Sequence, residues 1–408
     1  MPDARTSRRS GLIGLIGLFG LCFSGSGAAA RTPDVQPSDS QPPVWSFAIH
    51  GGAGVIERAN LSPEQDAAYR AALTRALEAG GKVLEDGGSA LDAVQAAIQI
   101  MEDDPLFNAG RGAVFTAAGH NELDAAVMNG ADLTAGAVAG LTTTRHPIAA
   151  ARAVMEQSPH VMLIGQGADA FAASVGLEQV APSYFFTQRR WDQLIKLLTE
   201  QGQPVPLPPA GAPGSPIGGM ADNDASAPPL NERKFGTVGA VALDSQGHLA
   251  AGTSTGGTNG KRWGRVGDVP VIGAGTYASN RDGCAVSATG DGEYFIRATV
   301  ARDICARIAQ LNVRTEEQEV ADQLEAHRAF CGGRPATEIC YVDTARPAYL
   351  AARAEIADAE ALGGKGGVIV MDTDGVPNFA MSTSGMYRGE IHPGEAARVA
   401  IYADETPQ

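Results

Sequence analysis

The sequence lacks the patterns that would bind a transition metal, a nucleic acid or an anionic membrane. Its five cysteines form no Cys-x-x-Cys pair and do not cluster with its seven histidines, which argues against a zinc or iron site. Acidic residues outnumber basic ones by 46 to 31, and the formal charge of -15 opposes binding to nucleic acids and anionic lipids. No internal repeat is present, and charged residues make up an ordinary 19%. We therefore expect a globular protein, compatible with a small polar substrate that the charge does not identify.

The N-terminus is typical of an export signal. Three arginines precede an apolar run over residues 11–23, and Ala28-Ala29-Ala30 provides a small-residue cleavage site. The apolar run is shorter than the roughly 20 residues that span a bilayer, which favours removal of residues 1–30 over a membrane anchor. Residues 31–44 are expected to be a disordered leader. The mature protein is then periplasmic or secreted, with no membrane segment, and the choice between general and twin-arginine export stays open.

Export permits disulfides in the mature protein. Cys331 and Cys340 flank a Gly-Gly-Arg-Pro turn and make a reasonable local pair. Cys284 and Cys305 lie in apolar surroundings, which favours buried thiols.

Periodicity and turn residues indicate a chain of both strands and helices. Residues 45–50 form a short apolar strand that ends in His-Gly-Gly-Ala-Gly, and two helices follow, one from Ser62 to about residue 79 and one from near Ser89. Because strands and helices fall in separate blocks, we favour packed sheets with helices outside over a doubly wound parallel sheet. The remaining expected elements are a hairpin of residues 112–116 and 122–128, a hairpin of 237–243 and 249–254, a strand over 284–288, a helix over 293–309, and a hairpin of 368–371 and 377–381.

Residues 201–233 contain eight of the chain's 24 prolines, with glycine, alanine and serine between them. Such a composition does not form a packed element, so this segment is expected to be a disordered linker. Composition alone favours an ordinary interdomain spacer.

A Gly236-Thr237 step follows that linker and opens a strand. A threonine hydroxyl is a weak nucleophile unless a base takes its proton. A free α-amino group on the same residue can be that base, because its pKa is near 7.7–8.0. Before cleavage the nitrogen is an amide, so an internal threonine needs a cut at the Gly236–Thr237 bond to become active. A strand-opening threonine alone is usually structural.

Several further motifs accompany this step in a fixed order. They are HGGAG at 50–54, PLFNAGRGAVF at 105–115, ELDAAVMNG at 122–130, GTVGAVALD at 236–244, TSTGGTNGKRWGRVGD at 253–268, SATGDGE at 287–293, and GGKGG with SGMYRG near the C-terminus. In this set the sequence resembles the plant-type asparaginase / isoaspartyl peptidase family of N-terminal-nucleophile hydrolases, over about residues 45–310 and 361–390. The resemblance implies an α+β fold, a four-layer αββα sandwich. It also implies two chains from one precursor, α (45–236, ending in the linker) and β (237–408), which together form one catalytic domain.

The resemblance also assigns the reacting groups. Thr237 becomes the nucleophile after autocleavage following Gly236, with its own amine as the base. Thr255 would orient that amine. Thr289 and Gly290 would contact the substrate and supply oxyanion-hole donors, which are typically worth about 3 kcal/mol each.

Arg265 and Asp268 are the implied contacts to the aspartyl head of the substrate. A guanidinium can hold its α-carboxylate in a bidentate pair, and a carboxylate can pair with its α-ammonium. Asn108 is a further polar contact near the nucleophile. His50 is expected to be a packed histidine, since the α-amine already serves as the base.

A loop over residues 101–111 resembles the family's sodium loop, in which backbone carbonyls hold the ion. The matching positions are Met101, Asp104, Phe107, Ala109 and Arg111. Carbonyl oxygens suit a hard cation. No cofactor is expected for catalysis itself, so sodium would be structural.

The implied substrates are L-asparagine and β-aspartyl (isoaspartyl) dipeptides, and the implied assembly is an (αβ)2 heterotetramer. Glycosylasparaginase, which cleaves the sugar–asparagine bond, is the nearest alternative. An exported, uncleaved binding protein for acidic amino acids, which would use Arg265 and Asp268 without catalysis, is the alternative from another class. The proline-rich linker and the segment 311–360 depart from the family pattern.

Overall fold

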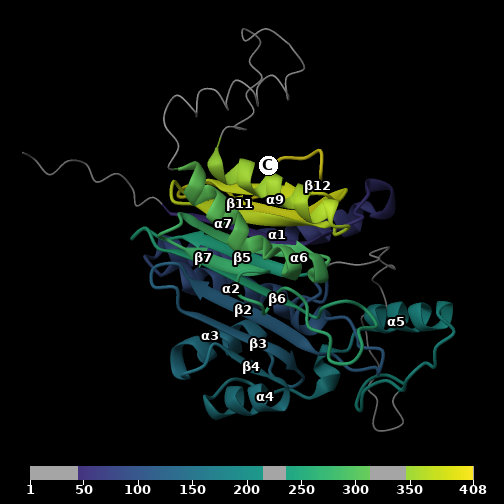
Figure 1. Ribbon diagram of the computed structural model, residues 1–408. Helices are drawn as coiled ribbons and strands as arrows, with labels where there is room; N and C mark the ends of the chain where they lie inside the picture. Colours follow the sequence, from purple (N-terminus) through teal and green to yellow (C-terminus); the bar gives the residue numbers. More distant parts are fainter. Residues whose placement is uncertain (1–44, 215–235, 313–345, 408) are drawn as a thin grey trace, which may run out of the picture. The chain divides into compact units, whose positions relative to one another are not determined.

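The computed structural model describes residues 45–214, 236–312 and 346–407, all within one compact unit that begins at Pro42 (Figure 1). Among these residues, eight strands form a large sheet and four form a smaller one. In spatial order the large sheet contains β12 (Arg398–Tyr402), β11 (Gly385–Ile391), β1 (Ser46–Gly54), β5 (Val238–Leu243), β6 (Leu249–Thr255), β2 (Leu123–Asn129), β3 (Ala135–Leu141) and β4 (Met162–Ile164). The smaller sheet contains β10 (Pro377–Met381), β9 (Gly366–Asp372), β8 (Cys284–Gly290) and β7 (Thr276–Ser279).

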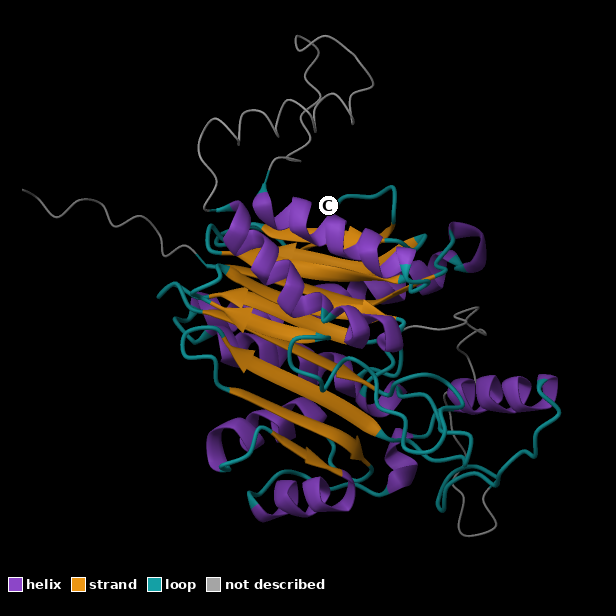
Figure 2. Ribbon diagram, viewed as in Figure 1, coloured by secondary structure: helices purple, strands orange, loops and turns teal. Residues whose placement is uncertain are grey.

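Most of the longer helices lie on the outer faces of the two sheets, whereas Gln188–Glu200 (α5) lies to the side (Figure 2). The sheets contact each other through β1, β5 and β6 on one side and β7, β8 and β9 on the other. α1, α2, α3 and α4 pack on the large sheet, and α7 and α9 pack on the smaller one. The helical segments are η1 (Arg58–Asn60), α1 (Pro63–Glu85), α2 (Ala90–Asp103), η2 (Gly110–Gly112), α3 (Pro147–Gln157), α4 (Gly165–Ser174), η3 (Pro182–Phe185), α5 (Gln188–Glu200), α6 (Gly292–Ala298), α7 (Val300–Leu311) and α9 (Pro347–Ala361). The expected α+β class is confirmed. In the described part of the chain, no helix is both long and apolar enough to cross a bilayer.

The small and apolar residues of β1, β5 and β6 suit these strands to the buried centre of the fold. Every residue of β1, β5 and β6 is buried, because one face meets the helices and the other meets the smaller sheet. Small residues dominate these strands, and they leave room for close packing: a Cβ at Gly239 would collide with Ser287 and His50 of neighbouring strands. The expected hairpin of β5 and β6 is confirmed, with antiparallel pairs from Val238–Ser254 to Leu243–Leu249.

Helix starts follow the local sequence closely. Ser62 caps α1 with Pro63 at its first position, and Ser89 caps α2; both serines form complete capping boxes. α1 continues to Glu85, beyond the expected end near residue 79.

Two local expectations are wrong. Residues 112–116 form no strand: the Asn121 side chain donates to the carbonyls of Ala113 (2.9 Å) and Val114 (3.1 Å), so these acceptors are not available to a partner strand. β2 pairs instead with β3 and β6. The helix expected over 293–309 is interrupted at Thr299, whose φ of 52° separates α6 from α7.

The expectation of free thiols at Cys284 and Cys305 is also wrong. Helix α7 packs on β8 and brings the two Cα atoms to 5.6 Å, where the cysteines form a disulfide across 21 residues of sequence. Both side chains are fully buried, which is why their apolar surroundings resemble those of thiols. The proposed pair of Cys331 and Cys340 lies outside the described residues.

We predict that the double substitution Cys284→Ala/Cys305→Ala lowers the free energy of unfolding by about 3 kcal/mol, because a loop of this length constrains the unfolded chain. Denaturant titration of the oxidised proteins measures the difference. Reducing agent should destabilise the wild type more than the variant. Free thiols at both positions in the native protein, found by alkylation and mass spectrometry, would contradict the prediction.

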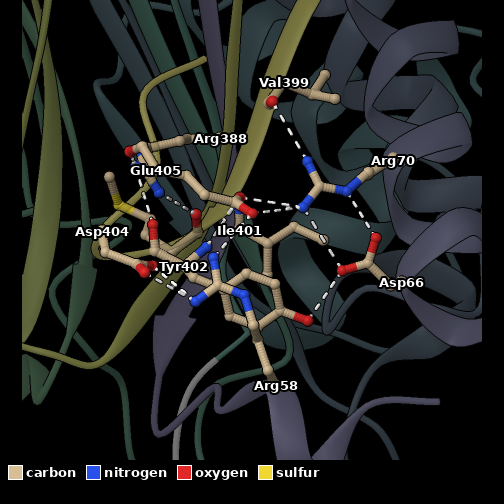
Figure 3. A network of polar contacts seen from close by, with 10 residues as sticks. Arg58, Asp66, Arg70, Arg388, Val399, Ile401, Tyr402, Asp404 and Glu405 are labelled. Carbon is tan, nitrogen blue, oxygen red and sulfur yellow. Dashed lines mark hydrogen bonds and ion pairs between the residues drawn. The ribbon is translucent and has the colours of Figure 1, made fainter. Parts of the chain in front are cut away.

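The C-terminal segment is anchored to the N-terminal part of the fold by ion pairs (Figure 3). Arg58 of η1 donates to the Asp404 carboxylate at 2.8 and 2.9 Å, and Arg70 of α1 donates to Glu405 at 3.0 Å. The buried Arg388 of β11 donates to the backbone carbonyl of Glu405. These contacts hold β12 and the following residues against α1.

Segments before and after the linker also interleave within the large sheet. β1 lies between β11 and β5, both of which come after residue 236, and β6 pairs with β2, which comes before it. The two parts of the chain therefore share one sheet.

Candidate functional site

Thr237 lies at the start of β5 and faces Thr255 at the end of β6. The antiparallel register pairs Val238 with Ser254, which brings the two threonines to neighbouring positions. The Thr237 hydroxyl donates to Thr255 Oγ1 at 3.1 Å, and Thr255 Oγ1 also accepts from the backbone amide of Gly257 at 3.0 Å. Because Thr237 donates its proton to Thr255, the lone pairs of Thr237 Oγ1 take no part in this hydrogen bond.

The carbonyl of Gly236 is held by the backbone of Asn108. Asn108 N donates to Gly236 O at 3.0 Å, so an amide dipole polarises the bond that would be cut. The Asn108 side chain is fixed on both sides, since Oδ1 accepts from Val114 N at 2.9 Å and Nδ2 donates to Gly257 O at 2.8 Å. Asn108 therefore lies beside Gly236, while its expected contact to the substrate stays a prediction.

Glycines make the close approach around this peptide bond possible. A Cβ at Gly236 would lie 2.7 Å from Asn108 Cβ. Gly52 of β1 has a φ of 111° and would bring a Cβ to 2.7 Å from Gly236 Cα. Any other residue at these two positions would displace the Gly236–Thr237 peptide bond.

His50 belongs to a buried chain of polar side chains that contacts Thr237. Its Nδ1 lies 3.1 Å from Thr237 O and its Nε2 lies 2.9 Å from Ser287 Oγ, which in turn is 2.7 Å from Thr253 Oγ1. Burial lowers the pKa of His50 to about 3, so the ring is neutral. A carbonyl can only accept, so Nδ1–H donates to Thr237 O and Nε2 accepts from the Ser287 hydroxyl. His50 is packed, as expected, and it fixes the Thr237 carbonyl.

Thr289 and Gly290 end β8, opposite β1 in the other sheet. Thr289 Oγ1 accepts from the backbone amide of Ala53 at 3.3 Å. This contact places Thr289 beside the residue that follows Gly52. Gly290 has no room for a side chain, because a Cβ there would lie 2.6 Å from Lys365 O. The two expected oxyanion-hole residues thus lie beside the end of β1, where Gly52 contacts Gly236.

Arg265 and Asp268 converge, as their spacing suggested. A Cβ at Gly292 would lie 2.8 Å from Asp268 Oδ1 and 2.9 Å from Arg265 Nη2, so both side chains meet at the same point. Arg265 donates to the Glu293 carboxylate at 2.9 and 3.1 Å. The sequence reasoning did not identify Glu293, although it lies in the SATGDGE motif three residues after Gly290.

Asp268 is a buried carboxylate with a free oxygen. Its exposed fraction is 5%, and its Oδ2 has no hydrogen-bond partner among the described residues. Burial raises the pKa of Asp268 to about 7. A buried carboxylate of this kind favours a cationic ligand, since an ammonium group would supply the missing charge and hydrogen bond.

In the loop after α2, the carbonyls of Asp104 and Ala109 accept hydrogen bonds within turns, and those of Phe107 and Pro105 lie close to each other. Asp104 O accepts from Phe107 N at 3.2 Å, and Ala109 O accepts from Gly112 N at 3.1 Å. A Cβ at Gly112 would collide with the carbonyl oxygens of Phe107 and Pro105. A cluster of neutral carbonyl oxygens fits a hard cation. Asn108 belongs to this loop and contacts Gly236, the residue before Thr237.

Comparison with known proteins identifies the family of this chain. The family described as asparaginase matches residues 43–333. The isoaspartyl peptidase of Escherichia coli is 44% identical over 360 residues, which cover 88% of this chain and 96% of that protein. The probable isoaspartyl peptidase/L-asparaginase 2 of Arabidopsis thaliana is 42% identical over 292 residues, 70% of this chain and 86% of the relative. The resemblance seen in the sequence motifs is confirmed, and the chain belongs to the asparaginase family.

Proposed function

We propose that this protein is an autoprocessing threonine hydrolase that cleaves isoaspartyl dipeptides and the side-chain amide of L-asparagine. The observation that carries the proposal is the geometry at one peptide bond. The Thr237 hydroxyl is oriented by Thr255 at 3.1 Å, while the preceding carbonyl is polarised by Asn108 N at 3.0 Å. The names of relatives at 40–44% identity supply the substrates, isoaspartyl peptides and asparagine.

The first reaction frees the nucleophile. Thr237 Oγ1 adds to the Gly236 carbonyl carbon, and its proton passes to the Thr237 nitrogen as the C–N bond breaks. The negative charge that develops on Gly236 O is stabilised by Asn108 N–H. Water then hydrolyses the resulting ester, which leaves a Gly236 carboxylate and a Thr237 that carries both its hydroxyl and a free amine.

The second reaction uses that amine as the base. Arg265 binds the α-carboxylate of the substrate and Asp268 binds its α-ammonium, which places the side-chain carbonyl at Thr237. The hydroxyl attacks, its proton passes through the amine to the leaving nitrogen, and ammonia or an amino acid departs. Thr289 and Gly290 stabilise the oxyanion, and water releases aspartate from the ester. Binding of the substrate carboxylate competes with Glu293 for Arg265.

The fold supports a cut within one catalytic domain. Because β1 lies between β11 and β5, the α and β chains stay joined by the same sheet after cleavage. Two contacting sheets with helices on both outer faces favour the four-layer αββα arrangement of N-terminal-nucleophile hydrolases. We further propose the (αβ)2 assembly, export to the periplasm or medium with loss of residues 1–30, and a structural sodium ion held by the carbonyls of the 101–111 loop.

A denaturing gel of the purified protein tests the processing. We expect two fragments that co-purify under native conditions, with Thr237 as the first residue of one. A persistently single chain that still hydrolyses asparagine would overturn the proposal. Turnover of isoaspartyl-leucine rather than a glycosylated asparagine distinguishes the proposed activity from that of a glycosylasparaginase.

A further inference from the structure

A pocket of about 410 Å³ lies beside the proposed catalytic residues and has no part in the mechanism above. One wall is the turn of residues 116–122, and the other is the loop of residues 261–264. The two walls are joined by backbone contacts, including Ala117 N to Lys261 O at 2.9 Å. The pocket is therefore a built feature of the fold.

Gly257 lies between the pocket and Thr255, the residue that accepts the hydrogen bond of Thr237. Gly257 holds Thr255 through its amide and Asn108 through its carbonyl. A Cβ at Gly257 would lie 3.2 Å from Lys261 Nζ, which belongs to the pocket wall, and 3.5 Å from Arg265 Nη1. Gly257 thus borders both the aspartyl-binding arginine and the pocket.

Trp263 lines this pocket in an unusual conformation. It is 96% exposed, the highest value among the large hydrophobic residues that the structure describes. Its φ of 56° lies in the left-handed region, which a bulky residue adopts at a cost. An exposed indole contributes little to folding, and residues held on strained backbone cluster at active sites and ligand clamps.

The two basic side chains that line the pocket, Lys261 and Arg262, differ in how many of their donors already have protein partners. Lys261 is paired with the carboxylates of Glu122 (3.7 Å) and Asp124 (3.9 Å). Arg262 donates one hydrogen bond within the described part of the chain, to Gln201 at 3.3 Å, and a guanidinium carries five N–H donors. Arg262 therefore has donors for a carboxylate.

We propose that this pocket receives the leaving amino acid of an isoaspartyl dipeptide, with its side chain on Trp263 and its free carboxylate on Arg262. The inference rests on the proposed function and extends it to the leaving group. L-Asparagine releases ammonia and leaves the pocket unused. An apolar or aromatic leaving residue gains the most from the indole.

The test compares two substrates that form the same aspartyl ester. In processed Trp263→Ala enzyme, kcat/KM for isoaspartyl-phenylalanine should fall about fivefold, the size of an aromatic contact, while that for L-asparagine stays unchanged. Trp263→Phe should retain most of the dipeptide activity. Ile164→Ala, at another exposed apolar residue (67%), is the matched control and should alter neither substrate.

A second variant tests the carboxylate contact. Arg262→Gln should raise KM for isoaspartyl-phenylalanine, and amidation of the dipeptide's C-terminus should abolish the difference from wild type. Equal losses on asparagine and dipeptide, or no loss on either in Trp263→Ala, would overturn the pocket assignment while leaving the proposed hydrolase intact. A wild type that hydrolyses neither substrate would overturn the proposed function and this inference together.

Discussion

Thr237→Ala is expected to give a single uncleaved chain with no detectable hydrolysis of asparagine or isoaspartyl-leucine. The substitution removes the hydroxyl that both reactions need, so processing and turnover should be lost together. Loss of a nucleophile of this type typically costs a factor of about 10⁶ in kcat. A denaturing gel and an ammonia-release assay measure the two effects.

Thr237→Ser is the matched control for this prediction. It retains the hydroxyl and, after cleavage, the amine, and we expect it to process and turn over more slowly. Both variants should remain folded, which circular dichroism checks, so that a loss of activity reports on the hydroxyl. A cut chain in Thr237→Ala would place the nucleophile at another residue.

The parts of the site that could be predicted from sequence are those with local causes. Thr237 and Thr255 meet because a turn joins β5 to β6 and fixes their register, and the turn residues are visible in the sequence. Arg265 and Asp268 meet because only two residues separate them. Ser62 and Ser89 start helices through contacts with residues three positions ahead.

The parts that could not be predicted depend on packing between distant segments. The disulfide of Cys284 and Cys305 requires α7 to lie on β8, and nothing near either cysteine indicates that contact. The neighbours of β1 are likewise distant, since β11 begins at Gly385. Asn121 shows the same limit on a smaller scale, because its side chain removes the acceptors of an expected strand.

Substitution of Asp268 is expected to change both the stability and the activity of the protein. Its pKa is raised from 3.8 to about 7 because burial withdraws the carboxylate from water. A carboxyl group with a raised folded-state pKa costs no stability at pH values below its unfolded-state pKa, because it is then protonated in both the folded and the unfolded protein. The penalty grows as pH rises from 3.8 to about 7 and is constant above, where it corresponds to about 4 kcal/mol of unfolding free energy.

Asp268→Asn should therefore stabilise the ligand-free protein at pH 8, by about 2 kcal/mol after the cost of an amide that lacks partners, and by almost nothing at pH 4. Thermal unfolding at the two pH values measures this. Asp66→Asn is the control, because the pKa of Asp66 is shifted in the opposite direction. Burial alone would raise this pKa, but hydrogen bonds from Arg70 and Tyr402 lower it. Its substitution should destabilise the protein at pH 8, and this loss should fade as pH falls through the folded-state pKa.

The same Asp268→Asn variant should lose roughly 100-fold in kcat/KM, because the substrate ammonium no longer meets a buried charge. L-Aspartate should raise the unfolding temperature of the wild type at pH 8, since its ammonium removes the penalty on Asp268, and should have little effect on the variant. A variant that is less stable than the wild type at pH 8, or that responds equally to aspartate, would show that Asp268 is a structural acid. The expected result instead shows that the Asp268 charge serves substrate binding at the expense of stability. This charge destabilises the ligand-free fold, and the substrate ammonium neutralises it.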